Sequence, residues 1–215
     1  MLKAVIWDMD GVIANTAPLH YEAWRKIAKK KGLNLTEEEF RATFGMKNPD
    51  ILEKLFGKLE EAEVEKLSFE KEEEFRALAR KGIGVFPGVV PLLRELHESG
   101  IKQAIASSTP IENIKIIVTT LKINEYFEVI VTGEDVKHGK PHPEVFLKAK
   151  EKLEVAPSEC LVIEDAEVGV EAAKRAGMKC LAVTNTLPRE KLKKADLVVS
   201  SLEEVNLSIL RQLFD

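Results

Sequence analysis

Asp8-Met9-Asp10-Gly11-Val12 is the stretch that decides the fold, and it directly follows the apolar run Lys3-Ala4-Val5-Ile6-Trp7. This run is β-branched and aromatic without a helical period, which predicts a short buried strand. Two carboxylates ~4 Å apart at the end of a strand repel each other by ~4 kcal/mol at an effective dielectric of ~20. A divalent cation relieves that repulsion, and Gly11 lets the backbone turn close to a ligand. Taken alone, the acidic pair is equally compatible with a turn that caps the following helix.

The composition indicates a soluble globular protein. Its 215 residues can bury one core and a second small domain, with 45% hydrophobic and 32% charged residues. The formal net charge of −4 argues against general nucleic-acid binding. The first residues already form a strand and no apolar run reaches the ~20 residues of a membrane span, so we expect neither signal peptide nor membrane contact. We expect a cytoplasmic location and two buried, unpaired thiols at Cys160 and Cys180.

The character of the chain changes after the first strand. Residues 15–82 contain no convincing strand, and apolar spacing predicts helices over 18–31, 49–56 and 60–80. A capping box at Thr36-Glu37-Glu38-Glu39 predicts a further helix that runs toward Phe40 and Phe44. The glycine-rich segment 82–88 is typical of a flexible return to the first domain.

Strands and helices alternate from there to the end of the chain. We expect strands over 102–106, 129–131, 161–163, 180–183 and 197–199, and helices over 90–98, 110–121, 144–152 and 168–176. Ser201-Leu202-Glu203-Glu204 predicts the start of a last helix. Alternating units imply a parallel sheet covered on both faces. The sequence therefore predicts an α/β fold, a Rossmann-like core over 1–14 and 86–215 with a small all-α cap over 15–85 inserted after the first strand.

Polar side chains follow the predicted strands. Ligands of open α/β sheets bind beyond the carboxyl ends of the strands. The chain places there Asp8 and Asp10, then Ser107-Ser108-Thr109, a loop with Lys140-Pro141, and Glu164-Asp165. Acids, hydroxyls and a lysine at one edge suit phosphoryl transfer, which needs charge neutralisation and positioning. A carboxylate can act as the nucleophile and pass through an aspartyl-phosphate.

Four segments in this order and spacing resemble the haloacid dehalogenase superfamily, over essentially the whole chain. They are Asp8-Met9-Asp10-Gly11-Val12, Ala106-Ser107-Ser108, Lys140-Pro141-His142-Pro143 and Val162-Ile163-Glu164-Asp165. The resemblance is to the phosphatase branch with a helical cap. Dehalogenases and phosphonatases of this family lack an acid at the position of Asp10, which favours phosphoryl transfer here.

The resemblance also implies roles. Asp8 would be the nucleophile, and Asp10 the general acid and then the general base. Mg²⁺ would be held by the Asp8 carboxylate, the Asp10 main-chain carbonyl and Asp165, with Glu164 either a ligand or a neighbour that contacts a ligand. Ser107 and Lys140 would bind phosphoryl oxygens, assisted by the amides of Gly11 and Ser108.

Structural interpretations stand beside some of these roles. Thr109-Pro110-Ile111-Glu112 has the pattern of a helix N-cap, so we expect Thr109 to be structural. Ser108 is compatible with either role. An isolated lysine before proline is normally only solvated, and it is the surrounding set that assigns Lys140 to a site.

The nature of the phosphoryl acceptor stays open between water and a sugar. The segment with His20 and Trp24, together with Lys71, is similar to the cap of β-phosphoglucomutases, in which these positions face the sugar phosphate. Those mutases carry an arginine for the distal phosphate where this chain has Asn48, and Asn cannot replace its bidentate charge. Lys47 can substitute for it only as a point charge. The missing arginine favours a phosphatase, while His20 also fits a solvent-facing helix position.

We therefore predict a Mg²⁺-dependent monomeric phosphatase that acts on a small phosphorylated metabolite, a sugar phosphate being the favoured class. A phosphosugar mutase is the alternative. A phospho-receiver domain would carry its acceptor on the third strand and no insertion after the first, and a non-catalytic binding module would lack part of the catalytic set. We also predict that the cap moves about residues 14–17 and 82–88.

Overall fold

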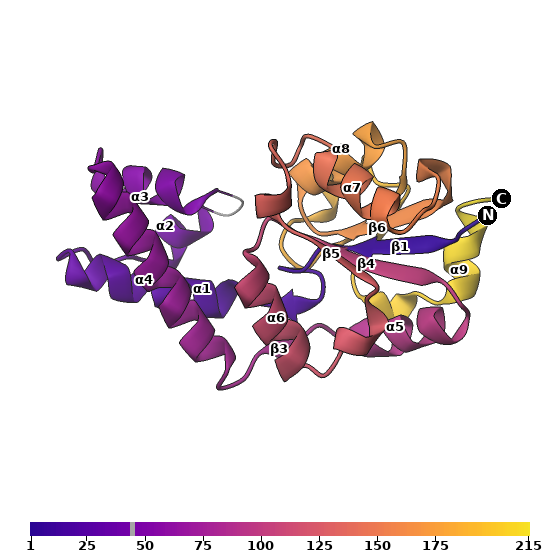
Figure 1. The fold of residues 1–215 in the computed structure, drawn as a ribbon, viewed down its shortest axis with the longest axis horizontal. Helices are drawn as coiled ribbons and strands as arrows, with labels where there is room; N and C mark the ends of the chain where they lie inside the picture. Colours follow the sequence, from indigo (N-terminus) through magenta and orange to yellow (C-terminus); the bar gives the residue numbers. More distant parts are fainter. Residues whose placement is uncertain (44–45) are drawn as a thin grey trace. The chain divides into compact units, whose positions relative to one another are not determined.

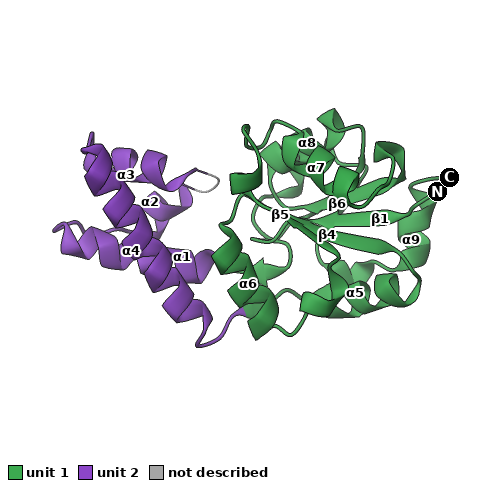
Figure 2. Cartoon of the chain, viewed as in Figure 1, with its two compact units in different colours: residues 1–15, 84–215 green, residues 16–83 purple. Residues whose placement is uncertain are grey.

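The computed structural model describes residues 1–43 and 46–215. The chain divides into two compact units, which Figure 2 shows in separate colours. One unit comprises residues 1–15 and 84–215, and we refer to it as the core unit. The other comprises residues 16–83 and is referred to as the helical unit.

The core unit, every residue of which is described, is built on a six-stranded parallel sheet in the order β5-β4-β1-β6-β7-β8 (Figure 1). The strands are β1 (Ala4–Trp7), β4 (Lys102–Ala106), β5 (Val129–Val131), β6 (Cys160–Glu164), β7 (Lys179–Val183) and β8 (Leu197–Val199). The order reverses at β1, between β4 and β6, and ligands of open parallel sheets bind at such a reversal.

Helices cover both faces of this sheet (Figure 1). They are α5 (Val89–Glu98), α6 (Ile111–Thr120), α7 (Glu144–Lys152), α8 (Glu167–Arg175) and α9 (Leu207–Gln212). α7 packs on β1, β4 and β5, α8 packs on β6 and β7, and α5 packs on β4 from the opposite face and contacts α9. The parallel sheet with its helical layers confirms the predicted α/β class.

The two faces of β1 are buried in different ways. Under α7 and α8, Ala4 and Ile6 join a cluster with Phe146, whose full burial contributes about 1.5–3 kcal/mol. On the other face, Trp7 Nε1 donates to Gln103 Oε1 at 3.1 Å, which satisfies the buried indole. β1 is therefore packed on both faces, and this packing positions the residue that follows it.

Both cysteines are buried free thiols, as expected. Cys160 lies in β6 and Cys180 in β7, within the apolar cluster under α7 and α8. Burial raises the pKa of Cys160 to about 12, so this thiol stays protonated and unreactive.

Two short strands, not predicted from the sequence, pair the chain segments that connect the units. β2 (Ala14–Asn15) pairs antiparallel with β3 (Gly84–Val85), and Phe86 N donates to Ile13 O at 3.1 Å. Two-residue strands are too short to show an alternating pattern, which is why segment 82–88 reads as irregular.

The helical unit contains α1 (Ala17–Lys30), α2 (Glu37–Arg41), α3 (Asn48–Phe56) and α4 (Glu61–Ala79). Trp24, Phe40 and Leu52 lie in its apolar core. The capping box before α2 is present, with Glu39 N donating to Thr36 Oγ1 and Thr36 N donating to Glu39 Oε2. The expected extension of this helix to Phe44 lies outside the described residues.

The expectation that Ser201 starts the last helix is wrong. Ser201 Oγ accepts from Glu203 N at the start of the single 3₁₀ turn η5 (Leu202–Glu204). The last helix, α9, is capped instead by Asn206, whose Oδ1 accepts from Ile209 N at 3.0 Å. A capping box specifies where a helical turn begins, and it carries no information about how many turns follow.

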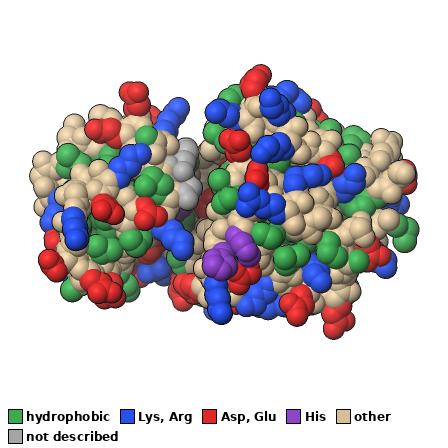
Figure 3. All heavy atoms as spheres, turned by 90° about the horizontal axis from the view of Figure 1, so that it is seen from above, with side chains coloured by type: hydrophobic (Ala, Val, Ile, Leu, Met, Phe, Trp, Pro, Cys, Tyr) green, Lys and Arg blue, Asp and Glu red, His purple; other side chains and the backbone are tan. Residues whose placement is uncertain are grey.

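Charged side chains of both signs are interspersed over the face shown in Figure 3. This distribution accompanies the formal net charge of −4. In the described part of the chain, no helix combines the length and the apolar character needed to cross a membrane.

Candidate active site

Asp8 stands directly after β1, at the carboxyl edge of the sheet. Its N–H donates to Ile163 O at 3.0 Å and so continues the pairing of β1 with β6. The chain then turns, with Gly11 at a φ of 81° and its N–H bonded to Ala14 O at 3.0 Å. A Cβ at Gly11 would lie 1.9 Å from Asp165 Oδ2, so only glycine allows both this φ and this close approach.

Lys140 joins two acids from two strands. Its Nζ donates to Asp8 Oδ1 at 2.7 Å and to Glu164 Oε1 at 2.6 Å. The ammonium is buried and lies 4.9 Å from the centroid of the Phe146 ring. Burial opposes its charged form, but the attraction of Asp8 and Glu164 is larger, and the pKa of Lys140 lies above its ordinary value. Lys140 is thus a fixed cation next to the proposed nucleophile.

Glu164 is the last residue of β6 and is almost fully buried. Its Oε1 accepts from Lys140, and its Oε2 accepts from the N–H groups of Asp165 at 2.9 Å and Ala166 at 3.0 Å. A Cβ at Gly169 in α8 would lie 1.8 Å from Oε1. Both oxygens of Glu164 therefore have protein donors, and the missing side chain at Gly169 makes room for the carboxylate.

Asp8, Glu164 and Asp165 form a buried acidic cluster. One carboxylate oxygen from each lies within 4.8 Å of the others. Burial, opposed mainly by Lys140, raises the pKa of Asp8 to about 7. Burial and the charges of Glu164 and Asp8 raise the pKa of Asp165 well above its ordinary value.

This cluster fits a hard divalent cation. Its donors are all oxygens, which Mg²⁺ and Ca²⁺ prefer over softer metals. Three acids face the single positive charge of Lys140, so the ionised cluster carries excess negative charge that a divalent ion would neutralise. A bound cation would also return the pKa values of Asp8 and Asp165 toward their ordinary values.

Thr109 contacts Asp10 and does not cap α6, in contrast to its structural interpretation. The hydroxyl of Thr109 donates to Asp10 Oδ2, across 99 positions of sequence. Pro110 is extended, with φ −57° and ψ 145°, so α6 begins at Ile111 and has no side-chain N-cap bond. Thr109 is consequently not the cap of α6. Its hydroxyl is bonded instead to the Asp10 carboxylate, which the fold places next to it.

The serines after β4 complete this edge of the core unit. Ser107 is buried, its N–H donates to Val131 O at 3.1 Å, and its Oγ accepts from Thr109 N at 3.2 Å. Ser108 is exposed. The pairing of Trp7 with Ile105 places both serines just beyond the position opposite Asp8.

The other predicted site residues lie in the helical unit, where they form a cluster of their own. Lys71 is buried, and its Nζ lies 2.9 Å from His20 Nδ1 and 2.8 Å from Glu72 Oε1. The ammonium is also 5.6 Å from the centroid of the Trp24 ring. His20 stacks on Phe75 with ring centroids 4.1 Å apart, so it is not simply solvent-facing.

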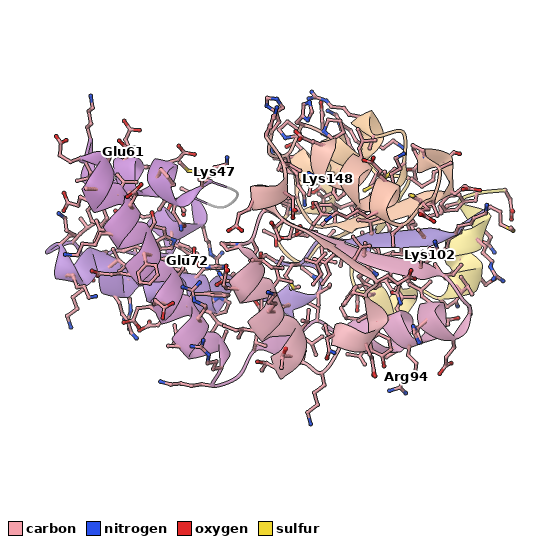
Figure 4. All side chains as sticks on the ribbon, in the orientation of Figure 1. Lys47, Glu61, Glu72, Arg94, Lys102 and Lys148 are labelled. Atoms are coloured by element: carbon pink, nitrogen blue, oxygen red, sulfur yellow. The ribbon has the colours of Figure 1, made fainter. Side chains whose placement is uncertain are left out.

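Asn48, at the position where the mutases carry an arginine, is hydrogen-bonded within the helical unit. Asn48, at the start of α3, donates from Nδ2 to Glu72 Oε1 at 2.8 Å. Glu72, labelled in Figure 4, comes from α4. Lys47, also labelled there, is exposed at the N-cap position of α3. Asn48 is thus part of the Lys71–Glu72 network and brings no positive charge to it.

The loop after β7 contributes contacts to the site that were not predicted from the sequence. Thr186 donates its hydroxyl to Asp165 Oδ2, and Asn185 Nδ2 donates to Gly11 O at 2.8 Å. The signal was available, because the predicted strand 180–183 ends on Thr184-Asn185-Thr186, a polar strand end like the others. Gly169 was also missed. A glycine within a helix carries no sign of the side chain for which it makes room.

Comparisons with known proteins agree on one family. A family model described as haloacid dehalogenase-like hydrolase matches residues 5–183. The phosphorylated carbohydrates phosphatase of Thermotoga maritima is 36% identical over 219 residues, which cover 99% of this chain and 100% of the relative. The beta-phosphoglucomutase of Bacillus subtilis is 35% identical, over 98% of this chain and 95% of the relative. The crystal structure of beta-phosphoglucomutase from Clostridium difficile matches with a TM-score of 0.88 at 30% identity, over 100% of this chain and 97% of that one.

Proposed function

We propose that this chain, which belongs to the haloacid dehalogenase-like hydrolases, is a Mg²⁺-dependent phosphatase that hydrolyses a small phosphorylated sugar through an aspartyl-phosphate on Asp8. The supporting observation is the contact network at the carboxyl edge of the sheet. Lys140 is bonded to both Asp8 and Glu164, and Asp165 lies in the same acidic cluster. This arrangement neutralises and orients a phosphoryl group, which is most of what phosphoryl transfer requires.

Asp8, Asp165 and the main-chain carbonyl of Asp10 would hold the metal ion. When bound, Mg²⁺ neutralises charge on the phosphoryl oxygens and on the carboxylates. Both oxygens of Glu164 already accept hydrogen bonds from Lys140 and from backbone amides. We therefore assign Glu164 to the orientation of Lys140 and not to the metal.

The first half-reaction transfers the phosphoryl group to the protein. A carboxylate oxygen of Asp8 attacks phosphorus, and the bond between phosphorus and the ester oxygen breaks. Protonated Asp10 donates its proton to that leaving oxygen, which departs as the sugar hydroxyl. The bond from the Thr109 hydroxyl to Asp10 Oδ2 orients this acid and is compatible with either of its protonation states.

The second half-reaction returns Asp8 to its starting state. Asp10, now a carboxylate, takes a proton from a water molecule whose oxygen attacks phosphorus, and the bond between phosphorus and Asp8 breaks. Lys140 and Ser107 hold the phosphoryl oxygens in both steps, so the charge that develops meets donors already in place.

The cluster in the helical unit supports a sugar as the group that carries the phosphate. His20 and Asn48 are partly exposed and carry hydrogen-bonding groups, while Lys71 and the rings of Trp24 and Phe75, which complete the cluster, are buried. Sugar hydroxyls can pair with hydrogen-bonding groups of this kind. The phosphatase relative from Thermotoga maritima is named for phosphorylated carbohydrates, which agrees with this class.

A phosphosugar mutase is the second candidate, favoured by the relatives named beta-phosphoglucomutase and by the His20–Lys71 contact. A mutase must bind a second phosphate group firmly. Asn48 offers an amide that is already bonded to Glu72, so the position that resembles the mutase arginine contributes no cation. This difference favours water as the phosphoryl acceptor.

A first experiment tests the nucleophile. Asp8→Asn should lower Mg²⁺-dependent hydrolysis of a chromogenic phosphate monoester by about 10⁴-fold or more, because the amide cannot attack phosphorus. Asp196→Asn is the matched control, because it replaces a carboxylate outside the acidic cluster, and it should keep near-normal turnover. Near-normal hydrolysis by a folded Asp8→Asn variant would show that the nucleophile is misassigned.

A second measurement separates the two candidate functions. β-Glucose 1-phosphate is supplied with Mg²⁺ and a catalytic amount of the 1,6-bisphosphate, and free phosphate and glucose 6-phosphate are followed together. A phosphatase releases phosphate faster than it forms glucose 6-phosphate. The opposite order would overturn the preference for hydrolysis, and a panel of sugar phosphates would then rank the substrates.

A further inference from the structure

Thr184-Asn185-Thr186, the segment that follows β7, reaches the proposed metal site from a strand that contributes no other residue to it. Thr186 donates its hydroxyl to Asp165 Oδ2, and Asn185 Nδ2 donates to Gly11 O at 2.8 Å. Asn185 and Gly11 are 174 positions apart in sequence. The two bonds therefore join three chain segments: the turn after β1, the residue after β6 and the loop after β7.

A second observation shows how closely these groups converge. A Cβ built on Gly11 would lie 1.9 Å from Asp165 Oδ2 and 2.8 Å from Thr186 Oγ1. The Gly11 backbone, the Asp165 carboxylate and the Thr186 hydroxyl thus meet at one point. Asp165 is buried, with 4% of its surface exposed, whereas Thr186 is exposed. An exposed side chain whose only polar group is turned onto a buried carboxylate is better explained by that contact than by packing.

From this geometry we infer that Thr186 is a positioning residue for the metal site and that Asn185 holds the turn that carries the Asp10 carbonyl. The inference rests on the proposed function, in which Asp165 binds Mg²⁺. A carboxylate with one oxygen engaged by a hydroxyl has a defined rotation and presents its other oxygen in one direction. Groups that hydrogen-bond to metal ligands in this way typically account for 10–100-fold in metal affinity.

The experiment measures metal binding without substrate or turnover. Mg²⁺ is titrated into the intact chain by calorimetry, for the unaltered protein and for Thr186→Val and Thr186→Ser. Val keeps the shape of Thr and removes the hydroxyl, whereas Ser keeps the hydroxyl and removes the methyl group. We expect Thr186→Val to weaken Mg²⁺ binding by about 10-fold and Thr186→Ser to stay within about twofold of the unaltered protein.

Thr132→Val is the matched control, because Thr132 also donates its hydroxyl to an Asp carboxylate, that of Asp135, outside the acidic cluster. It should leave the Mg²⁺ affinity unchanged. If Thr186→Val binds Mg²⁺ as tightly as the unaltered chain, or if Thr186→Ser binds as weakly as Thr186→Val, the role of the hydroxyl is refuted.

Asp165→Asn distinguishes this failure from a failure of the proposed function. If Asp165→Asn weakens Mg²⁺ binding and Thr186→Val does not, the metal site stands and the positioning role falls. If Asp165→Asn itself leaves Mg²⁺ binding unchanged, the metal site is misplaced, and the inference about Thr186 falls together with it.

Discussion

Glu164 and Asp165 are consecutive in sequence, yet the fold gives them different partners. Glu164 ends β6 and accepts three hydrogen bonds, one from Lys140 and two from backbone amides. Asp165 is bonded to Thr186 and lies against Gly11. Neighbouring residues at a strand end point to opposite faces, so one acid turns toward Lys140 and the other toward the turn after β1. This difference in contacts predicts a difference in function.

We predict that Glu164→Gln and Asp165→Asn impair different steps. Gln has one acceptor oxygen and cannot satisfy both Lys140 and the two amides, so we expect kcat to fall by about 100-fold with Mg²⁺ affinity nearly unchanged. Asp165→Asn should instead weaken Mg²⁺ binding by about 10-fold or more. Initial rates over a Mg²⁺ titration separate the two effects. A loss of Mg²⁺ affinity in Glu164→Gln as large as in Asp165→Asn would make Glu164 a metal ligand.

At the scale of the elements, the periodic helices and the core strands follow from the sequence pattern, including the three-residue strands β5 and β8, while the two-residue strands β2 and β3 and two helix starts do not. The expected strand 102–106 and helix 144–152 have the observed bounds of β4 and α7. The capping pattern at Thr109 fails because Pro110 is extended and α6 begins at Ile111, and the pattern at Ser201 begins only a 3₁₀ turn. A capping pattern is local in sequence, whereas the backbone conformation at a helix start also depends on the surrounding fold.

One ion-pair network links α8 to β7 and predicts a pH-dependent contribution to stability. Asp196 Oδ2 accepts from Lys174 Nζ at 2.7 Å and from Cys180 N at 2.8 Å. Burial acts to raise the pKa of Asp196, but these bonds prevail and the net pKa lies below its ordinary value of 3.8. A carboxyl group with a lowered pKa in the folded state stabilises the fold above its unfolded-state pKa.

We therefore expect Asp196→Asn to lower the free energy of unfolding by about 1 kcal/mol at neutral pH, since the group is partly exposed and its interactions are screened. The difference should persist down to about pH 4 and vanish as the pH falls through the folded-state pKa of Asp196, where both side chains are neutral. Urea unfolding of both proteins at neutral and strongly acidic pH measures this. An equal deficit at both pH values would assign the loss to packing and not to charge.

At the scale of the whole molecule, the chain is divided into a core unit and a helical unit joined by two segments. These segments pair as β2 and β3, so both connections are ordered at the same place. The prediction that the helical unit moves about residues 14–17 and 82–88 places the hinge in two segments that include this pairing. The monomeric state and the cytoplasmic location stay predictions from the sequence.

Distances between spin labels test this movement. Cys160 and Cys180 are buried and should not react with the label. Spin labels can therefore be attached to cysteines introduced at two exposed positions, by Lys58→Cys in the helical unit and by Lys115→Cys in α6. We expect Mg²⁺ with orthovanadate, a phosphate analogue, to shift the distance between these labels, because closure excludes water during catalysis. A pair at Lys115→Cys and Lys193→Cys, both in the core unit, should not change. Identical distributions for the first pair with and without the analogue would falsify the movement.

The α/β class, the helical insertion and the set of strand-end residues can be predicted from the sequence, because periodicity reports burial within a few turns of chain and a parallel sheet gathers its carboxyl ends at one edge. Which of these residues form hydrogen bonds with one another follows only from the tertiary structure. Lys140 meets Asp8 across 132 positions, Thr109 meets Asp10 across 99, and Thr186 meets Asp165 across 21. The donors and acceptors of these bonds become neighbours only when the sheet assembles. No local sequence pattern therefore specifies which of them pair.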